Sequence, residues 1–286
     1  METTMFWSCT GIDAAELSFG AAKLMADTGK TLIAELPCLG IPRLGFVCGV
    51  MDRGRNTEAA ITYFEQNRKL SWDMAHSIGK RLYALPASVF AAPDYPVAAK
   101  ASIETLRGFV SALHHLAASR DCDHLVLECQ GQMHSPMAFF SLKIARQVVV
   151  PLGKTTDAAY ALACIRRLAQ VYKHSPGRFI LASATGVKAI ENVVCAKGRD
   201  SGKLDGLRVT AWDCRKVKSL LDSLPVDDES TDFTERGEWL AEAAKAKTAP
   251  EALAAMGASK ETEVAAVPEE AMAAEEAEIP EEAVNL

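Results

Sequence analysis

Continuous apolar runs alternate with amphipathic stretches along the first three quarters of the chain. Four runs of five or six residues are rich in β-branched and aliphatic side chains, at residues 31–36, 124–128, 147–152 and 178–182. Runs of this length and continuity are typical of strands that are covered on both faces. A short opening run at 5–9 and a late one at 207–212 extend the series. The pattern therefore predicts six buried strands.

Between these runs, apolar residues return every three or four positions, which indicates amphipathic helices. The clearest helices are expected at residues 14–27, 102–118, 156–172 and 215–224. Strands that alternate with helices form a parallel sheet with helices on both faces. The sequence therefore predicts an α/β fold with a doubly wound, mostly parallel sheet. Ligands of such sheets bind at the carboxyl ends of the strands.

Two parts of the chain depart from this alternation. Residues 53–96 mix aromatic and charged residues with three prolines, and we expect one or two helices, a short strand near 81–85 and a loop. From about Pro225 the chain is rich in Ala, Glu and Pro. We expect an α/β domain, a helical extension and a disordered acidic tail. Their predicted ranges are 1–225, 226–247 and 248–286.

Charge is concentrated at the end of the chain. The net charge is −6, but residues 248–286 hold ten glutamates and one lysine, a net of −9, so the remaining residues are close to neutral at +3. Proteins that bind nucleic acids gather Lys and Arg on one face, and so small an excess predicts no nucleic-acid partner. No apolar run approaches the roughly 20 residues of a membrane span, and the N-terminus does not resemble a secretion signal. We expect a cytoplasmic protein that does not insert into membranes.

The eight cysteines are scattered among apolar segments. None forms a C-x-x-C pair or lies near histidines at the spacing of zinc ligands. We interpret them as buried thiols in a reducing compartment, and we expect no metal site.

Two Gly-Lys-Thr tripeptides share part of the sequence of a phosphate-binding loop. Such a loop uses glycine amides, a lysine and a hydroxyl to hold phosphates and magnesium. Residues 29–31 lie between a predicted helix and a strand, which is the wrong order, and we interpret them as a helix C-cap and the start of a strand. Residues 153–155 follow a strand but lack the first glycine of the motif. We interpret them as a helix N-terminus that Thr155 or Thr156 caps.

The start of the chain resembles the ParA/MinD family of ATPases. That family begins with a strand, the loop K-G-G-x-G-K-[ST]-[ST], a helix, a Gly-Lys turn and a second strand that ends in an acid. Aligned through the Gly-Lys turn, residues 9–16 (CTGIDAAE) fall on the loop, where Gly11 is the one remaining glycine. The resemblance implies that the family's phosphate-binding lysine falls on Ala14, its first lysine on Cys9 and its magnesium-binding hydroxyl on Ala15.

The resemblance implies further changes at the nucleotide site. Thr10 and Asp13 lie in the same loop, and Asp13 places a negative charge where a triphosphate would lie. Glu35 and Glu128 stand where the family has strand-end aspartates, and residues 182–184 stand where it often has an asparagine that reads adenine. We interpret both glutamates as acids that point into solvent above the strand ends. We expect a vestigial nucleotide pocket with no catalytic residue, cofactor or metal.

The resemblance implies a P-loop NTPase-like fold and, with these changes, a pseudo-ATPase. We expect it to serve as a positioning or scaffold subunit of a larger bacterial assembly of the pilus, secretion or partition type. Residues 85–96 and the helix that follows resemble the pilus-associated TadZ/CpaE branch. Family members often dimerise with their nucleotide sites face to face. This implies protein partners and a homodimer with contacts near Gly11, Gly40 and Gly131.

Two alternatives remain open. In the first, the chain binds ATP and magnesium through an altered loop, as a switch or an ATPase, and Lys30, Lys154 or a lysine from a partner subunit supplies the missing charge. In the second, Glu128 and His134 form the acid/base pair of an enzyme that acts on a small molecule. The second alternative requires a deep pocket at the strand ends.

Overall fold

The computed structural model describes residues 1–36, 41–90, 100–131, 135–198 and 206–223. In these residues the chain forms one eight-stranded sheet of order β3-β4-β2-β5-β1-β6-β7-β8. Every pairing is parallel except that of β3 with β4. The strands are β1 (Glu2–Ser8), β2 (Thr31–Leu36), β3 (His76–Ser77), β4 (Leu82–Leu85), β5 (His124–Gln130), β6 (Gln147–Leu152), β7 (Phe179–Ser183) and β8 (Arg208–Ala211).

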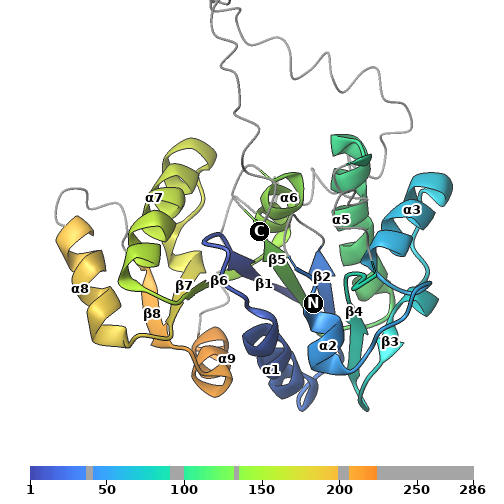
Figure 1. Ribbon diagram of the computed structural model, residues 1–286, viewed down its shortest axis with the longest axis horizontal. Helices are drawn as coiled ribbons and strands as arrows, with labels where there is room; N and C mark the ends of the chain where they lie inside the picture. Colours follow the sequence, from blue (N-terminus) through green and yellow to red (C-terminus); the bar gives the residue numbers. More distant parts are fainter. Residues whose placement is uncertain (37–40, 91–99, 132–134, 199–205, 224–286) are drawn as a thin grey trace, which may run out of the picture. The chain divides into compact units, whose positions relative to one another are not determined.

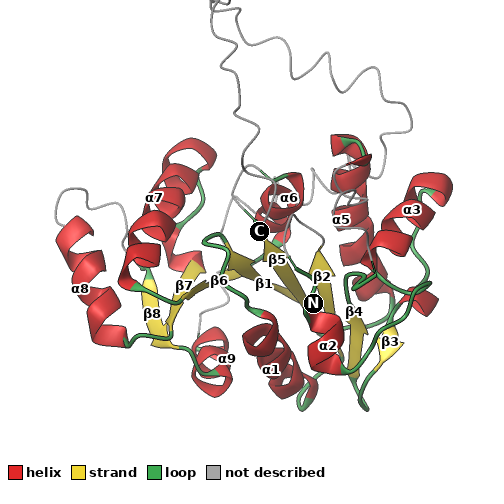
Figure 2. Ribbon diagram, in the orientation of Figure 1, coloured by secondary structure: helices red, strands yellow, loops and turns green. Residues whose placement is uncertain are grey.

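Helices cover both faces of this sheet, as Figures 1 and 2 show. One face carries α1 (Ala15–Ala26), α2 (Leu44–Cys48) and α9 (Cys214–Asp222). The other face carries α3 (Thr57–Asn67), α5 (Ile103–Ser119), α6 (Pro136–Ile144), α7 (Thr155–Tyr172) and α8 (Val187–Gly198). Short 3₁₀ turns lie at Trp72–Met74 and Pro176–Arg178. The predicted doubly wound α/β fold is confirmed.

The two layers of helices give the sheet two hydrophobic cores. Successive side chains of a strand point to opposite faces. In β1, Met5 and Trp7 belong to the cluster that contains Phe109 of α5, whereas Phe6 belongs to the cluster that contains Leu17 of α1. Both sets are fully buried or nearly so. Burial on both faces explains why the strands read as continuous apolar runs.

The strand order changes direction at β1. The chain passes from β1 to β2 on one side of the sheet, and β5 later inserts between them, whereas β6 pairs with the other side of β1. The backbone N–H of Gly131, after β5, donates to the carbonyl of Ser8 at the end of β1 over 3.4 Å. We call the edge formed by the carboxyl ends of the parallel strands the crest. Ligands of open α/β sheets bind at such a reversal.

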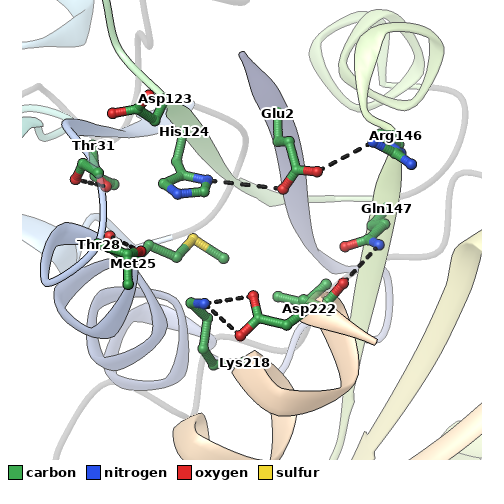
Figure 3. A network of polar contacts seen from close by, with 12 residues as sticks. Glu2, Met25, Thr28, Thr31, Asp123, His124, Arg146, Gln147, Lys218 and Asp222 are labelled. Atoms are coloured by element: carbon green, nitrogen blue, oxygen red, sulfur yellow. Dashed lines mark hydrogen bonds and ion pairs between the residues drawn. The ribbon is translucent and has the colours of Figure 1, made fainter. Parts of the chain in front are cut away.

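The opposite edge of the sheet is joined by polar contacts, which Figure 3 shows. Glu2, at the start of β1, lies 3.1 Å from Arg146 Nη1 and 3.9 Å from His124 Nδ1. The side-chain amide of Gln147 donates to the carbonyl of Leu221 in α9 over 3.3 Å. These contacts connect the amino ends of β1, β5 and β6 with the end of α9.

The turn at residues 29–31 belongs to this amino edge. The C-cap of α1 is Asp27, two residues before the glycine that the sequence suggested, and Gly29 N–H donates to the carbonyl of Met25 over 3.0 Å. Lys30 Nζ donates to the carbonyl of Arg120 over 2.6 Å and lies 4.9 Å from the centroid of the Trp72 ring. The tripeptide is therefore a structural turn, and β2 begins at its third residue as expected.

Several predictions from the sequence lie outside the described residues. These are the helical extension at 226–247, the tail at 248–286, Gly40, His134 and residues 91–96 of the segment that resembles the TadZ/CpaE branch. Within the described part of the chain, every helix is too short or too polar to cross a membrane.

The packing of Gly29 yields a stability prediction. A Cβ at this position would lie 2.6 Å from the Asp123 Cβ atom, so Gly29→Ala must displace the start of β5. We expect the free energy of unfolding, measured by urea denaturation, to fall by about 1–3 kcal/mol. Gly54→Ala is the matched control, because its nearest neighbour would be an Asp52 oxygen at 3.7 Å. Equal stabilities of the two variants would contradict this prediction.

Candidate functional site

The loop after β1 forms the centre of the crest. Gly11 has a φ of +79°, and its N–H donates to the carbonyl of Ser8 over 3.1 Å, so the chain turns sharply here. Cys9, Ala14 and Ala15 are buried, with exposed fractions of 4% or less. Burial raises the pKa of the Cys9 thiol above its usual range, which makes the thiol unreactive.

Ile12 fills the space between this loop and the loop after β6. A Cβ built on Gly153 would lie 2.7 Å from Ile12 Cδ1, so the isoleucine side chain rests directly against the glycine backbone. A phosphate-binding loop instead curls its backbone amides around an open cradle. The loop after β1 is therefore closed by an apolar side chain.

Asp13 occupies the N-terminus of α1. Its Oδ1 accepts a hydrogen bond from the N–H of Ala15 over 2.9 Å, and its Oδ2 lies 2.9 Å from Arg43 Nη1. The N-terminus of a helix carries a partial positive charge and free N–H groups, which a phosphate or a carboxylate satisfies. Here the chain's own carboxylate takes that position. Arg43 also pairs with the charge of Asp13.

Glu35 and Glu128 lie side by side on adjacent strands. They are register partners in the pairing of β2 with β5. Both point to the face that carries α1, because Ile33 and Val126, two residues earlier on each strand, belong to the cluster that contains Leu17. Their exposed fractions are 3% and 0%. The expectation that they point into solvent is wrong, because α1 and the segment that contains α2 cover them.

Glu35 connects two segments of the crest. Its Oε1 accepts from the N–H of Arg43 over 2.7 Å, and its Oε2 accepts from the N–H of Ala87 over 2.9 Å. The carboxylate therefore holds the segment after β2 against the segment after β4. Burial raises the pKa of Glu35 to about 7, although these amide hydrogen bonds lower it.

Glu128 faces α1 from β5. Its Oε2 accepts from the hydroxyl of Ser18 over 3.2 Å. Burial, together with the charges of Glu35 and Asp13, raises the pKa of Glu128 to about 8, against hydrogen bonds from Ser18 and Gln130. Glu128 therefore holds a proton at neutral pH. Among the described residues, no group of three or more His, Cys, Asp or Glu side chains is placed to hold a metal ion.

The N-terminus of α7 is also satisfied by a carboxylate. Asp157 Oδ2 accepts from the N–H groups of Gly153 and Lys154 over 3.1 and 2.7 Å. The predicted cap by Thr155 or Thr156 is therefore wrong. An acid at the third helical position reaches back to the cap residue, which is a known capping arrangement.

An open pocket of about 670 Å³ lies beside Ile12, over the ends of β6, β7 and β8. Lys154 brings a positive charge to it, and Trp212 brings a large aromatic ring. The side chains and backbone that line it belong to Ile12, Gly153, Lys154, Asp157, Ala184 and Trp212.

The structure brings together only part of the predicted site. Asp13, Glu35 and Glu128 lie close to one another beneath the crest. Lys30 precedes the amino end of β2 and contacts Arg120, so it lies at the opposite edge of the sheet and does not supply a charge to the crest.

Sequence reasoning missed Arg43, because no local motif links it to Asp13, thirty residues earlier. It also missed Asp157, whose signal was an acid three residues after Lys154, the residue that caps α7.

The buried glutamates predict how stability depends on pH. The folded chain keeps a proton on Glu128 up to a pH of about 8, whereas the ordinary value is 4.5. Between these values the folded state binds more protons than the unfolded state, so this contribution to the free energy of unfolding falls as pH rises. Glu128→Gln removes the titrating group. We expect the stability advantage of the variant over the parent to be about 3 kcal/mol larger at pH 8 than near pH 5.

Urea denaturation across this pH range measures the effect. Glu16→Gln, at an exposed position of α1, is the control and should follow the parent curve. A Glu128→Gln curve parallel to that of the parent would show that the glutamate does not retain its proton.

Comparison with known proteins identifies the fold. No family model matches the chain, and no curated protein matches it. Solved structures match at low identity across most of the chain. A putative plasmid partition protein from Borrelia burgdorferi, bound to AMPPNP, has a TM-score of 0.56 at 12% identity and covers 86% of this chain and 99% of its own.

Two further solved structures give the same result. MinD from Aquifex aeolicus, in a complex with MinC, has a TM-score of 0.53 at 13% identity and covers 92% and 99% of the two chains. An McdA–ATP complex from Cyanothece has a TM-score of 0.53 at 14% identity. The match covers 87% of this chain and 98% of the McdA chain. At these identities the likeness establishes the architecture. The chain has the fold of the ParA/MinD family of ATPases.

Proposed function

We propose that this chain is a ParA/MinD-like pseudo-ATPase that acts as a positioning or scaffold subunit of a larger bacterial assembly. The observation that carries the proposal is the state of the loop after β1. Asp13 accepts the hydrogen bond at the N-terminus of α1 that a phosphate would accept, and Ile12 lies against Gly153. Such a loop leaves neither the amides nor the space that a triphosphate requires.

The positions of the family's catalytic groups support the same proposal. Ala14 and Ala15 are fully buried small side chains, so they offer no charge and no hydroxyl to a nucleotide. Glu128 is fully buried and contacts Ser18 of α1. A protonated, enclosed carboxyl group is a poor ligand for magnesium, which prefers ionised oxygens in open octahedral geometry.

A scaffold acts through its surfaces, and we propose a homodimer that meets at the crest. Gly11 and Gly131 lie there, as the resemblance implied. MinD from Aquifex aeolicus, which has this fold, was solved in a complex with another protein, MinC. The assignment to a pilus, secretion or partition machine, and to the TadZ/CpaE branch, remains a prediction from the sequence.

A nucleotide titration tests the proposal. We expect fluorescently labelled ATP with magnesium to show no saturable binding to the full chain at micromolar concentrations, because α1 lacks a free anion site. Saturable micromolar binding that Gly11→Ala abolishes, in a variant whose circular dichroism matches the parent, would overturn the pseudo-ATPase.

A nucleotide-binding switch is the second candidate, and the pocket beside Ile12 favours it. Lys154 and Trp212 line this pocket, and a cation beside an aromatic ring suits a planar, negatively charged ligand. If ATP binds there, Lys154→Ala and Trp212→Ala should each weaken binding about tenfold or more in the same titration. Lys69→Ala, at an exposed site on another part of the surface, is the control and should leave binding unchanged.

The enzyme hypothesis gains no support from the described residues. Its acid/base pair requires Glu128 to meet a substrate, but this side chain has an exposed fraction of 0% and is enclosed beneath α1. Its partner in that hypothesis, His134, lies outside the described residues.

A further inference from the structure

An exposed apolar surface lies beside the crest, on the side of β2 and β4. Phe46 projects from the short helix α2 with 61% of its surface exposed, Met51 follows with 57%, and Phe90 after β4 has 51%. Large side chains of this kind are normally buried, and several of them in one place mark a binding surface. We call Phe46, Met51 and Phe90 the α2 patch.

The α2 patch is continuous because its two segments pack together. A Cβ on Gly45, next to Phe46, would lie 3.6 Å from both Pro86 Cβ and Val89 Cγ1. The N–H of Val50 donates to the carbonyl of Gly45 over 2.8 Å, which brings the residue before Met51 to the same place. Glu35 fixes both segments through its two amide hydrogen bonds. The two segments that carry the α2 patch are therefore fixed relative to each other.

Arginines surround the α2 patch. The guanidinium of Arg53 lies 4.8 Å from the centroid of the Phe90 ring. Arg43, the residue just before α2 begins at Leu44, pairs with Asp13 and still has 47% of its side chain exposed. Of the nearby acids, Glu58 is buried and accepts from the N–H of Ser88, whereas Asp52 accepts from the N–H of Gly54 and keeps its charge. A binding partner should therefore be apolar and acidic.

The chain carries a segment of this chemistry just beyond α9. Residues 227–242 contain seven acids and one arginine, a net charge of −6. At helical spacing, Phe233, Leu240 and Ala244 fall on one face, whereas Glu235, Glu238 and Glu242 fall on another. An amphipathic helix that docks through such a face is a common mode of recognition. We propose that residues 227–244 of this chain cover the α2 patch.

The distance from the end of α9 to the α2 patch is within reach of the residues that follow Ser223. The described chain ends at Ser223, and α9 packs against α1, which in turn packs against α2 on the same face of the sheet. Two neighbouring helix spacings amount to about 20 Å. Residues 224–232, which include the acidic start of the segment, span up to about 30 Å when extended, so Phe233 can reach the patch. The tether also raises the local concentration of the segment to roughly millimolar, which favours it over a free peptide.

A second copy of the chain is a poorer occupant of this surface. If two α2 patches faced each other across a two-fold axis, Arg43 and Arg53 of one copy would meet the same arginines of the other. Like charges brought together in this way are destabilising. Residues 227–244 instead carry negative charges, which complement the arginines, and apolar side chains, which complement the α2 patch.

Hydrogen exchange of the full chain tests the proposal. The first variant carries Glu235→Lys, Glu238→Lys and Glu242→Lys, and the second carries Phe233→Ser and Leu240→Ser. In both we expect the amides of residues 44–52 and 86–90 to exchange about tenfold faster than in the parent, because the cover is lost. The matched control carries Glu275→Lys, Glu276→Lys and Glu278→Lys, the same change of charge beyond the segment, and should exchange as the parent does.

Three results would overturn the proposal. The first is unchanged exchange at the patch in both segment variants, with circular dichroism that confirms folding. The second is protection that grows with protein concentration, which would assign the patch to a second copy. The third is co-sedimentation of the full chain with phosphatidylserine vesicles that Phe46→Ser abolishes, which would assign it to a membrane surface.

Discussion

Backbone amides at the crest are satisfied by carboxylates of the chain itself, and the remaining features of the site depend on this. Asp13 accepts from the start of α1, Glu35 from the segments after β2 and β4, and Asp157 from the start of α7. Buried or half-buried amides require a partner, and an anion is the strongest one for a helix N-terminus. In a phosphate-binding fold that anion arrives with the ligand, whereas here it is covalently attached.

The chain shares its architecture with solved neighbours at identities of 12–14%. The sheet, its two apolar cores and the reversal of strand order at β1 depend on the pattern of buried side chains rather than on a ligand. Many sequences satisfy that pattern. A fold of this kind is therefore separable from its chemistry, and function must be argued from the site.

The sequence predicted the core strands well because two-sided burial leaves a simple signal. The run at 147–152 became β6 with the predicted bounds, and the later strands differ by only a few residues. The two-residue strand β3 was missed, because an edge strand so short has no periodicity. The bounds of α2 were also beyond prediction. Its position is fixed by Glu35, whose amide partners come from two distant segments.

The candidate site was harder to predict than the fold. Nothing in the local sequence shows that Glu35 and Glu128 become register partners, because the pairing of β2 with β5 joins residues more than ninety positions apart. Their burial followed from that pairing and from the helix that covers it. The cap of α7 could have been predicted from the local sequence. Asp157 lies at the third helical position, but we assigned the cap to the threonines that precede it.

The position of Ala14 bears on how such a chain could change over evolutionary time. Its side chain is fully buried in the cluster that contains Phe6 and Leu17, so a lysine there would have to displace core side chains before it met any phosphate. The Ile12 side chain would have to move away from Gly153, and Asp13 would have to release the N–H of Ala15. Each of these changes alone would weaken the protein and confer no nucleotide binding. If the chain is the pseudo-ATPase proposed above, a return to nucleotide binding would require changes at Ala14, Ile12 and Asp13 together, whereas its surface can change one residue at a time.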